Sequence, residues 1–453
     1  MTKMRPNYIS TTNACKLCKP LGASLVFKGI EGSVPYLHGS QGCATYMRRY
    51  IISHFNEPID IASSSLGEKH AIYGGGPNLK LGLTNVIKKY RPGMIGIATT
   101  CLTETIGDDV AMILDEYRRE VNSPENLPTL VHVQTPSYSG THMEGFHAAV
   151  AAVVDQLAGS NEKTDAITLL PGFVSAADLR YLKEVVADFG LDTILLPDYS
   201  ETLDGPARLQ YEKIPAGGTS LTAISKAGGS RQAVEFGRTI DEERTGGAVL
   251  HEKFNIERKV LGLPIGINET DLFFNLLCSI SGKGIPEKHA MERGRLVDAY
   301  VDGHKYVFGK KAVVYGEEDM VVGLTSFLTE IGIRPVLCAS GGRSGHLAAA
   351  IRAVTEESLA GQPRVEEGMD FYDIAAAAEE LGPDLLIGHS KGYPLARKLN
   401  IPLIRVGFPI HDRVGGQRIL HLGYRGAQQL FDTIANALIA RKQDMSDVGY
   451  SYM

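Results

Sequence analysis

Three cysteines lie in short turns of small residues, where a thiolate can reach a bound metal. Cys18 stands in CKPLGAS, Cys43 in HGSQGC and Cys101 in TTCLTE. Small neighbours let the backbone approach a bound group closely, and iron–sulfur clusters need thiolates that converge from such loops. Each cysteine taken singly is more typical of a small buried residue. Together they are candidate ligands of an iron–sulfur cluster.

The other three cysteines do not complete a second site in the sequence. Cys15 and Cys18 form C-x-x-C, which is typical of half a zinc site or of a redox pair. No second C-x-x-C and no spaced histidine pair follows, so a zinc site is disfavoured. Cys278 and Cys338 stand in apolar runs and are expected in the core.

The position of Cys101 relative to its neighbours also favours a cofactor. It directly follows the apolar run 94–100, and ligands of open α/β sheets gather at the carboxyl ends of strands. We expect Cys101 on a loop there, before a helix that begins at GDDV. Asp108 and Asp109 suit the first turn of that helix.

The elements that must position these residues are short strands alternating with helices. The strands are expected in eight runs rich in Ile, Val and Leu: 94–100, 130–135, 166–172, 193–198, 311–316, 334–340, 384–390 and 402–408. Such runs are typical of parallel strands buried on both faces, and the intervening segments have helical patterns that stop at glycine. The sequence predicts an α/β protein with three doubly wound, parallel-sheet, Rossmann-like domains.

We place the domains at 1–160, which holds the candidate ligands, at 161–304 and at 305–453. Residues 201–246 are polar and rich in glycine, and we expect an irregular excursion there. Residues 247–310 have a mostly helical pattern and are expected to link the second and third domains.

Composition limits the class of protein. The 453 residues carry a net charge of −6, which disfavours nucleic-acid binding. No apolar run is long enough to span a membrane, and the first residues lack the apolar core of a secretory signal. Six cysteines are too few for a disulfide framework, so we expect a cytoplasmic protein in a reducing compartment.

Two further motifs and four histidines have open interpretations. Tyr73 precedes three glycines that resemble a phosphate nest, but the Lys-Ser/Thr ending of a nucleotide-binding loop is missing. Tyr73 is therefore either an aromatic for protein docking or a half-buried anchor. Ser137 and Ser139 in TPSYSGT have no His–Asp relay in the sequence, which disfavours a serine hydrolase. The histidines, structural or proton-donating, are His38, His54, His70 and His142.

Nine motifs in this order give a more specific indication. They are CKPLGA, HGSQGC, HFNEP, YGGG, TTCLTETIGDD, TPSYSGT, LLPGFV, LDGP and VGFPIHDR. Through them most of the chain resembles the nitrogenase component 1 family, on its beta-subunit side.

The resemblance implies a heterotetramer of two alpha and two beta subunits. In the family, an eight-iron P-cluster, [8Fe-7S], lies between the subunits, and the beta-subunit cysteines match Cys18, Cys43 and Cys101. A serine that can ligate the oxidised cluster matches Ser137, and an aromatic that docks the ATP-dependent [4Fe-4S] iron protein matches Tyr73. The substrate-reducing cluster lies in the alpha subunit, so no catalytic residue is expected here.

Three family functions remain open. They are a nitrogenase, a nitrogenase-like reductase such as a methylthio-alkane reductase, and the scaffold that matures the iron–molybdenum cofactor on a [4Fe-4S] cluster. The cysteine triad with Ser137 favours a reductase, whereas the opening NACKLC resembles the scaffold branch or the nitrogenase-like reductases. We expect a nitrogenase-like reductase of N2 or of an organic sulfur compound, with the scaffold as the alternative. A non-enzymatic subunit with a degenerate cluster site is a further possibility of another class.

Overall fold

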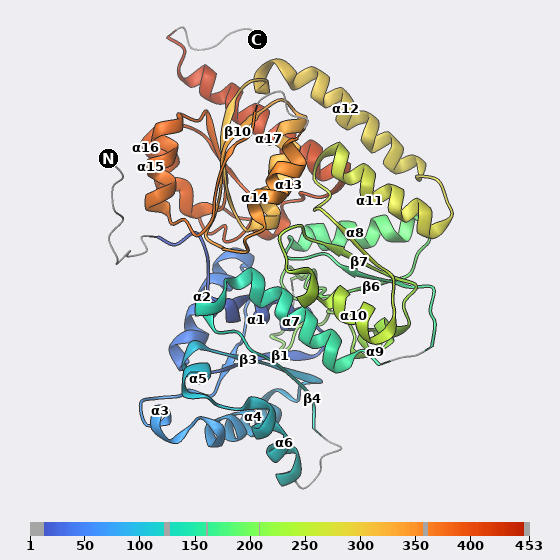
Figure 1. Ribbon diagram of the computed structural model, residues 1–453, viewed down its shortest axis with the longest axis vertical. Coiled ribbons are helices and arrows are strands. Elements are labelled where there is room, and N and C mark those ends of the chain that lie inside the picture. The colour runs from blue at the N-terminus through green and yellow to red at the C-terminus, as the bar shows by residue number, and fades with distance from the viewer. Residues whose placement is uncertain (1–12, 122–126, 160–161, 208, 357–360, 448–453) are drawn as a thin grey trace.

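The computed structural model describes residues 13–121, 127–159, 162–207, 209–356 and 361–447. Residues 1–12, on which the expectation of no secretory signal mainly depends, lie outside the described residues. The described chain contains three separate sheets with exclusively parallel pairing, each flanked by helices (Figure 1). The predicted α/β fold with three parallel-sheet units is therefore confirmed.

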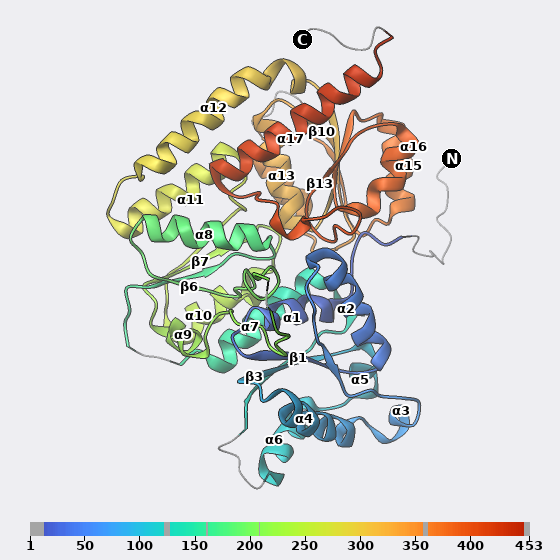
Figure 2. The same cartoon turned by 180° about the vertical axis from the view of Figure 1, so that it is seen from behind.

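The first sheet has the order β2 (Ala62–Ser63), β1 (Ser33–His38), β3 (Met94–Thr99) and β4 (Thr129–Val133). Every residue of β1 and β3 is buried, because helices cover both faces. One face packs against α1 (Lys19–Lys28) and α7 (His142–Leu157), and the other against α4 (Gly76–Tyr90) and α6 (Val110–Glu120) (Figures 1 and 2).

The second sheet has the order β6 (Thr193–Leu195), β5 (Ile167–Leu170), β7 (Gln232–Phe236) and β8 (Arg258–Leu261). Its helices include α8 (Ala176–Asp188), α9 (Leu221–Lys226) and α10 (Gly246–Phe254).

The irregular excursion expected over 201–246 is wrong in its last part, because β7 is an inner strand there. Its sequence, QAVEF, carries two polar residues that interrupt the apolar run. The buried carboxylate of Glu235 accepts hydrogen bonds from the Thr245 hydroxyl and from Arg258 Nε at 2.8 and 2.9 Å. Partners distant in the chain thus allow a charged residue in a buried strand.

The third sheet has the order β11 (Arg364–Glu366), β10 (Arg334–Ser340), β9 (Lys311–Gly316), β12 (Leu385–Gly388) and β13 (Leu403–Arg405). The surrounding helices are α13 (Glu318–Glu330), α14 (Leu347–Thr355), α15 (Phe371–Leu381), α16 (Tyr393–Leu399) and α17 (Gly423–Asp444). All eight predicted runs contain strands, and the segment 247–310 holds α10, β8, α11 (Gly266–Ser281) and α12 (Glu287–Val307).

One hydrophobic cluster extends from Leu17 to Leu438 and joins residues of all three sheets and their helices. The proposed domain limits at 160/161 and 304/305 stay a prediction, since this shared core fixes no boundary. In the described ranges, no helix combines the length and apolar character needed to cross a membrane.

Helices α1 and α7 pack closely enough that glycine is required on both. A Cβ on Gly22 of α1 would lie 1.8 Å from the carbonyl oxygen of His142, and one on Gly145 of α7 would lie 1.9 Å from that of Lys19. This contact fixes the N-terminal end of α1, where Cys18 is found.

Candidate functional site

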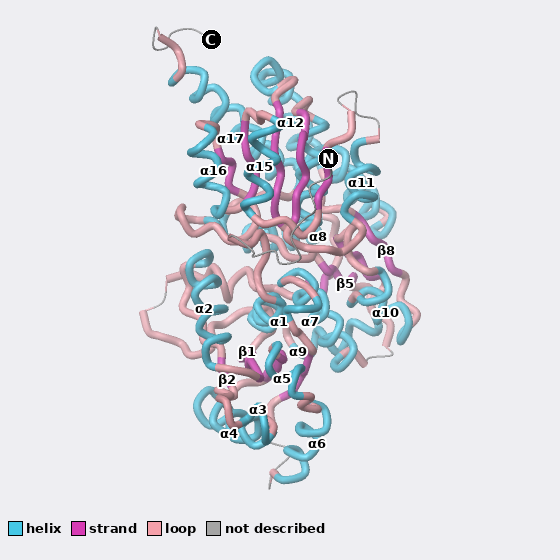
Figure 3. Tube along the Cα trace, turned by 60° about the vertical axis from the view of Figure 1, so that its left-hand side comes forward, coloured by secondary structure: helices cyan, strands magenta, loops and turns pink. Residues whose placement is uncertain are grey.

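Each of the three predicted ligand cysteines stands at the N-terminal end of a helix. Cys18 is the N-cap residue of α1, Cys43 is the third residue of α2 (Gln41–Phe55), and Cys101 is the first residue of α5 (Cys101–Ile106). In Figure 3, which brings this side of the molecule forward, α1, α2 and α5 face the viewer. The positive end of a helix favours a thiolate over a thiol.

Two adjacent strand ends carry Cys43 and Cys101. Strand β1 ends at His38 and leads through Gly39 and Ser40 into α2, while β3 ends at Thr99 and leads through Thr100 into α5. A Cβ on Gly39 would lie 2.2 Å from Thr100 Oγ1, so only glycine lets the two loops touch. The expectation that Cys101 follows a strand end is confirmed, although it begins α5 rather than standing on a loop.

Cys18 is close enough to the other two thiols to interact electrostatically with both. Burial raises the pKa of the Cys18 thiol, a hydrogen bond with Ser137 lowers it, and the charges of Cys101 and Cys43 raise it again. The three side chains are partly exposed. Ionising all three would concentrate negative charge, which a bound cationic group would compensate.

Ser137, in the short 3-10 helix η2 (Ser137–Ser139), connects two of the cysteines. Its hydroxyl oxygen accepts a hydrogen bond from the Lys19 backbone nitrogen at 3.2 Å, and its own backbone nitrogen donates to Cys101 Sγ at 3.1 Å. On the third cysteine, the Ser40 hydroxyl donates to Cys43 Sγ at 3.4 Å. Thiolate sulfurs that accept such hydrogen bonds fit iron–sulfur ligation.

The cysteines outside this group behave differently. Cys15 is buried, which raises its pKa to about 12, and its Sγ lies 3.6 Å from His389 Nε2. Burial also raises the pKa of Cys338 to about 12 and confirms it as a core residue, whereas Cys278 is only partly buried against the core. No trio of Cys, His, Asp or Glu within the described ranges could hold a single metal ion.

Tyr73 ends the short helix α3 (His70–Tyr73) and is 83% exposed, beside Ile72 at 79%. It is therefore not a half-buried anchor. The glycines that follow it do form an anion-binding turn, but a carboxylate of the chain fills it: both oxygens of Asp108 accept from the Gly75 backbone nitrogen, at 3.1 and 3.0 Å.

Asp108 was predicted in the first turn of a helix, and that position is wrong. Asp109 is the N-cap of α6 and accepts from the Met112 nitrogen at 3.0 Å, so the helix begins after both aspartates. Asp108 instead receives a hydrogen bond from His38 Nε2 at 3.0 Å. No local pattern could have revealed this, because Gly75 and His38 are 33 and 70 positions away.

The other histidines singled out above make structural contacts. His142 Nε2 lies 3.0 Å from Glu317 Oε1, and the Ile410 backbone nitrogen donates to His54 Nδ1 at 3.0 Å. Burial alone would raise the pKa of Glu317, but the hydrogen bond and charge of His142 hold it below its usual range. His70 bonds within its own turn, to Gly67.

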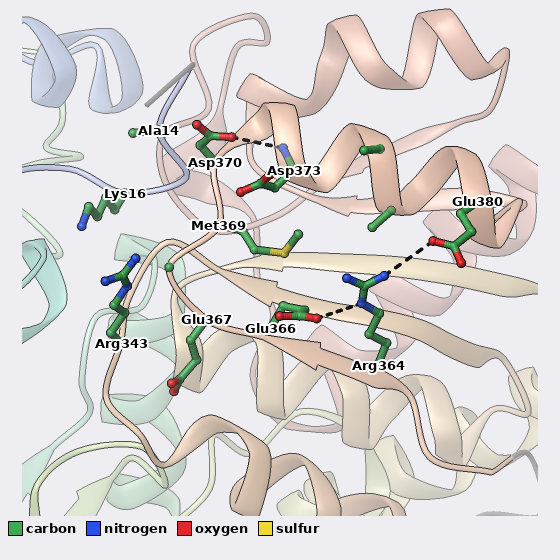
Figure 4. Close-up of a pocket in the computed structure, with 13 residues that line it drawn as sticks. Ala14, Lys16, Arg343, Arg364, Glu366, Glu367, Met369, Asp370, Asp373 and Glu380 are labelled. Atoms are coloured by element: carbon green, nitrogen blue, oxygen red, sulfur yellow. Dashed lines mark hydrogen bonds and ion pairs between the residues drawn. The ribbon is translucent and has the colours of Figure 1, made fainter. Parts of the chain in front are cut away.

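A cavity of about 350 Å³ beside the third sheet is a poorer candidate site (Figure 4). Three of its charged residues pair with one another, because Arg364 lies 2.9 Å from Glu366 and 3.7 Å from Glu380. Asp370 accepts from the Asp373 backbone nitrogen at 3.1 Å and caps α15. None of the five predicted site residues lines this cavity.

Comparisons with known proteins find relatives over nearly the whole chain. A family model described as nitrogenase component 1 type oxidoreductase matches residues 18–439. The nitrogenase molybdenum-iron protein beta chain of Clostridium pasteurianum is 35% identical over 428 residues, covering 94% of this chain and 93% of its own length. The beta chain of Azotobacter vinelandii is also 35% identical, covering 95% and 84%. A solved structure described as nitrogenase Cp1 at pH 6.5 superposes with a TM-score of 0.95 at 32% identity, covering 100% of this chain and 98% of its own.

Proposed function

This chain belongs to the family of nitrogenase component 1 type oxidoreductases, and we propose that it is the beta subunit of a nitrogenase-like reductase that relays electrons through an interfacial P-type iron–sulfur cluster. The observation that carries the proposal is that Cys18 interacts electrostatically with both Cys43 and Cys101, each at the N-terminal end of a helix, while Ser137 bonds Cys18 and Cys101.

The donor chemistry supports a cluster shared with another chain. Three partly exposed thiols of one chain fit a multi-iron group at an interface better than a closed, buried mononuclear site. When bound, an [8Fe-7S] cluster supplies reversible one-electron steps. The residues of this chain would provide three thiolates, hydrogen bonds to two of the sulfurs, and the Ser137 oxygen as a further ligand in the oxidised state.

Two protein partners follow from the proposal. A homologous alpha subunit would complete the cluster in a heterotetramer and hold the substrate-reducing centre, so we assign no catalytic residue to this chain. An ATP-dependent [4Fe-4S] iron protein would dock on the exposed pair of Ile72 and Tyr73, whose apolar surface is otherwise open to water. The final electron acceptor would be N2 or an organic sulfur compound such as a methylthio-alkane.

The first experiment is anaerobic purification of the chain with its alpha subunit, followed by iron analysis and activity assays. We expect Cys101→Ala to lower iron-protein-dependent reduction of N2 or of a methylthio-alkane by about 100-fold, because a thiolate ligand is lost. The matched control is Cys278→Ala, which removes a partly buried thiol on α11 and should leave reduction within about twofold.

Two outcomes would contradict the proposal. About four irons or fewer per alpha–beta pair beyond those of the alpha subunit's own centre would exclude a P-type cluster. Reduction that survives in Cys101→Ala would exclude electron transfer through the thiolates. Delivery of a cofactor to an apo-nitrogenase that depends on Cys101 would instead favour the maturation scaffold.

A further inference from the structure

One carboxylate, that of Asp108, connects the exposed pair Ile72 and Tyr73 to the segments that begin the Cys43 and Cys101 helices. Two residues after Tyr73, the Gly75 nitrogen donates to both oxygens of Asp108. A Cβ on Gly75 would lie 2.5 Å from Asp108 Oδ2 and 2.8 Å from His38 Cε1, so the turn is pressed onto both side chains. A displacement of the Tyr73 turn must therefore move Asp108, His38 or both.

His38 transmits the contact to both strand ends. Its side chain is fully buried, and that of Asp108 is 8% exposed, so the 3.0 Å hydrogen bond between them is shielded from water. The His38 carbonyl oxygen accepts from the Thr100 nitrogen at 3.1 Å and from Thr103 Oγ1 at 3.0 Å, which holds the start of the Cys101 helix. Through the chain, His38 is followed directly by the loop into the Cys43 helix.

A third contact closes this network. His38 Nδ1 lies 3.0 Å from Ser64 Oγ, and that oxygen accepts from the Gly39 nitrogen at 2.8 Å. Asp108 itself follows α5 by two residues, and its backbone nitrogen donates to the Thr103 carbonyl oxygen at 3.1 Å. The carboxylate thus bonds the docking turn on one side and is attached to the Cys101 helix on the other.

We propose that Asp108, acting with His38, is a positioning residue that couples the Ile72–Tyr73 surface to the helix N-termini that carry Cys43 and Cys101. This proposal depends on the proposed function in one respect: it takes from it which partner docks at the surface and which cluster the thiolates bind. Contact at the surface shifts the Gly75 turn, and the buried Asp108–His38 pair passes the shift to both thiolates. The described contacts of the Asp108 and His38 side chains are with Gly75, with Ser64 and with each other, so we assign them a positioning role.

The first test measures hydrogen–deuterium exchange in the purified heterotetramer without iron protein. We expect Asp108→Asn to accelerate exchange about tenfold at Gly75 and at residues 100–103, because a charge-assisted hydrogen bond is lost. The control is Asp109→Asn, which removes the neighbouring charge and keeps a good N-cap. Wild-type exchange at residues 100–103 in Asp108→Asn would overturn the proposal.

The second test perturbs the surface side of the network. Gly75→Ala forces the turn away from Asp108, and we expect faster exchange at residues 100–103 by about tenfold. The matched control is Gly67→Ala, on the other side of α3, where an added Cβ meets no atom within 4 Å. A response of Gly75→Ala that stays within its own turn would refute coupling, whatever partner docks there.

The third test separates positioning from general damage by comparing two electron donors. In Asp108→Asn, reduction of the cluster by the iron protein should slow about tenfold, whereas reduction by a small viologen and the iron content should stay within twofold. Equal slowing with both donors would overturn the proposal. If the wild-type complex accepts no electrons from an iron protein, the proposed function fails, and the exchange results still decide the coupling.

Discussion

At the scale of single residues, Ser137 has two separate roles that a substitution can distinguish. Its backbone nitrogen donates to Cys101 Sγ, and its side chain contacts Cys18 and the Lys19 nitrogen. Replacing the side chain leaves the backbone donor in place. The hydroxyl, in contrast, has no substitute among small apolar residues.

We therefore predict that Ser137→Ala raises the midpoint potential of the most oxidised couple of the bound cluster, because an alkoxide ligand would no longer stabilise the oxidised form. Potentiometric titration monitored by electron paramagnetic resonance measures this shift. Ser139→Ala is the control, since that hydroxyl bonds only Lys19 Nζ and the Pro136 carbonyl in the described contacts. Equal shifts in both variants would argue against ligation by Ser137.

The role of a residue was predictable from the sequence where it belongs to a motif. It was not predictable where the role depends on a contact between distant segments. Cys18, Cys43 and Cys101 each lie in a recognisable motif, and in the structure Cys18 lies close enough to the other two to interact electrostatically with both. Asp108 also lies in a motif, but its importance depends on Gly75 and His38, which no local pattern connects to it. Sequence patterns show what a residue can do, whereas the fold decides which groups it meets.

At the scale of elements, the packing of α1 against α7 sets the place of Cys18. Both helices use a glycine where the other backbone passes, and the space for a side chain is absent. Glycine inside a helix costs about 1 kcal/mol relative to alanine. The close approach must outweigh that cost.

We predict that Gly22→Ala lowers the free energy of unfolding by about 1–3 kcal/mol, because the added methyl overlaps the His142 carbonyl of α7. Gly294→Ala in α12 is a matched control, since an added Cβ there meets no atom within 4 Å, and it should raise stability by about 0.5–1 kcal/mol. Chemical denaturation of both variants compares them. Similar effects would contradict the close-packing argument.

A strand was predictable from the sequence when its apolar residues follow one another without interruption. The strand β3, MIGIAT, is apolar throughout and stood out in the sequence. The strands β1, SVPYLH, and β7, QAVEF, are equally buried but contain Pro35 and Glu235, which disrupted the pattern. Thr245 and Arg258 make the buried Glu235 acceptable, and such partners are visible only in the folded structure.

At the scale of the whole molecule, buried polar contacts join segments far apart in the chain. His54 of α2 accepts from Ile410, 356 positions away, and Asp178 of α8 accepts from the backbone of His421 and Leu422. Such contacts supplement the shared hydrophobic core. They also make the assembly of the three sheets sensitive to protonation.

Two buried histidines, His54 and His389, determine the pH at which acid begins to destabilise the fold. Burial lowers the pKa of both His54 and His389 from 6.5 to about 3, despite the opposing charge of Glu317. The folded state keeps them neutral, and protonating His54 at Nδ1 would break its bond with Ile410. Below pH 6.5 the unfolded chain therefore binds more protons than the folded chain. The free energy of unfolding consequently decreases as the pH is lowered. Carboxylates with depressed pKa values, such as Glu317 and Asp178, add to this loss only below about pH 4.5.

We accordingly predict that the urea midpoint of unfolding declines between pH 7.5 and pH 5, with each of the two histidines contributing roughly 2 kcal/mol at pH 5. His54→Gln should be less stable at pH 7.5 and show a flatter decline, because its titration is removed. His304→Gln, at an exposed position, should follow the wild-type curve. Burial raises the pKa of Glu318 to about 7, so protonating this carboxylate stabilises the fold in the same window, and the test is therefore the difference between the wild-type and His54→Gln curves. Equal slopes in these two proteins would contradict the assignment of a neutral, buried His54.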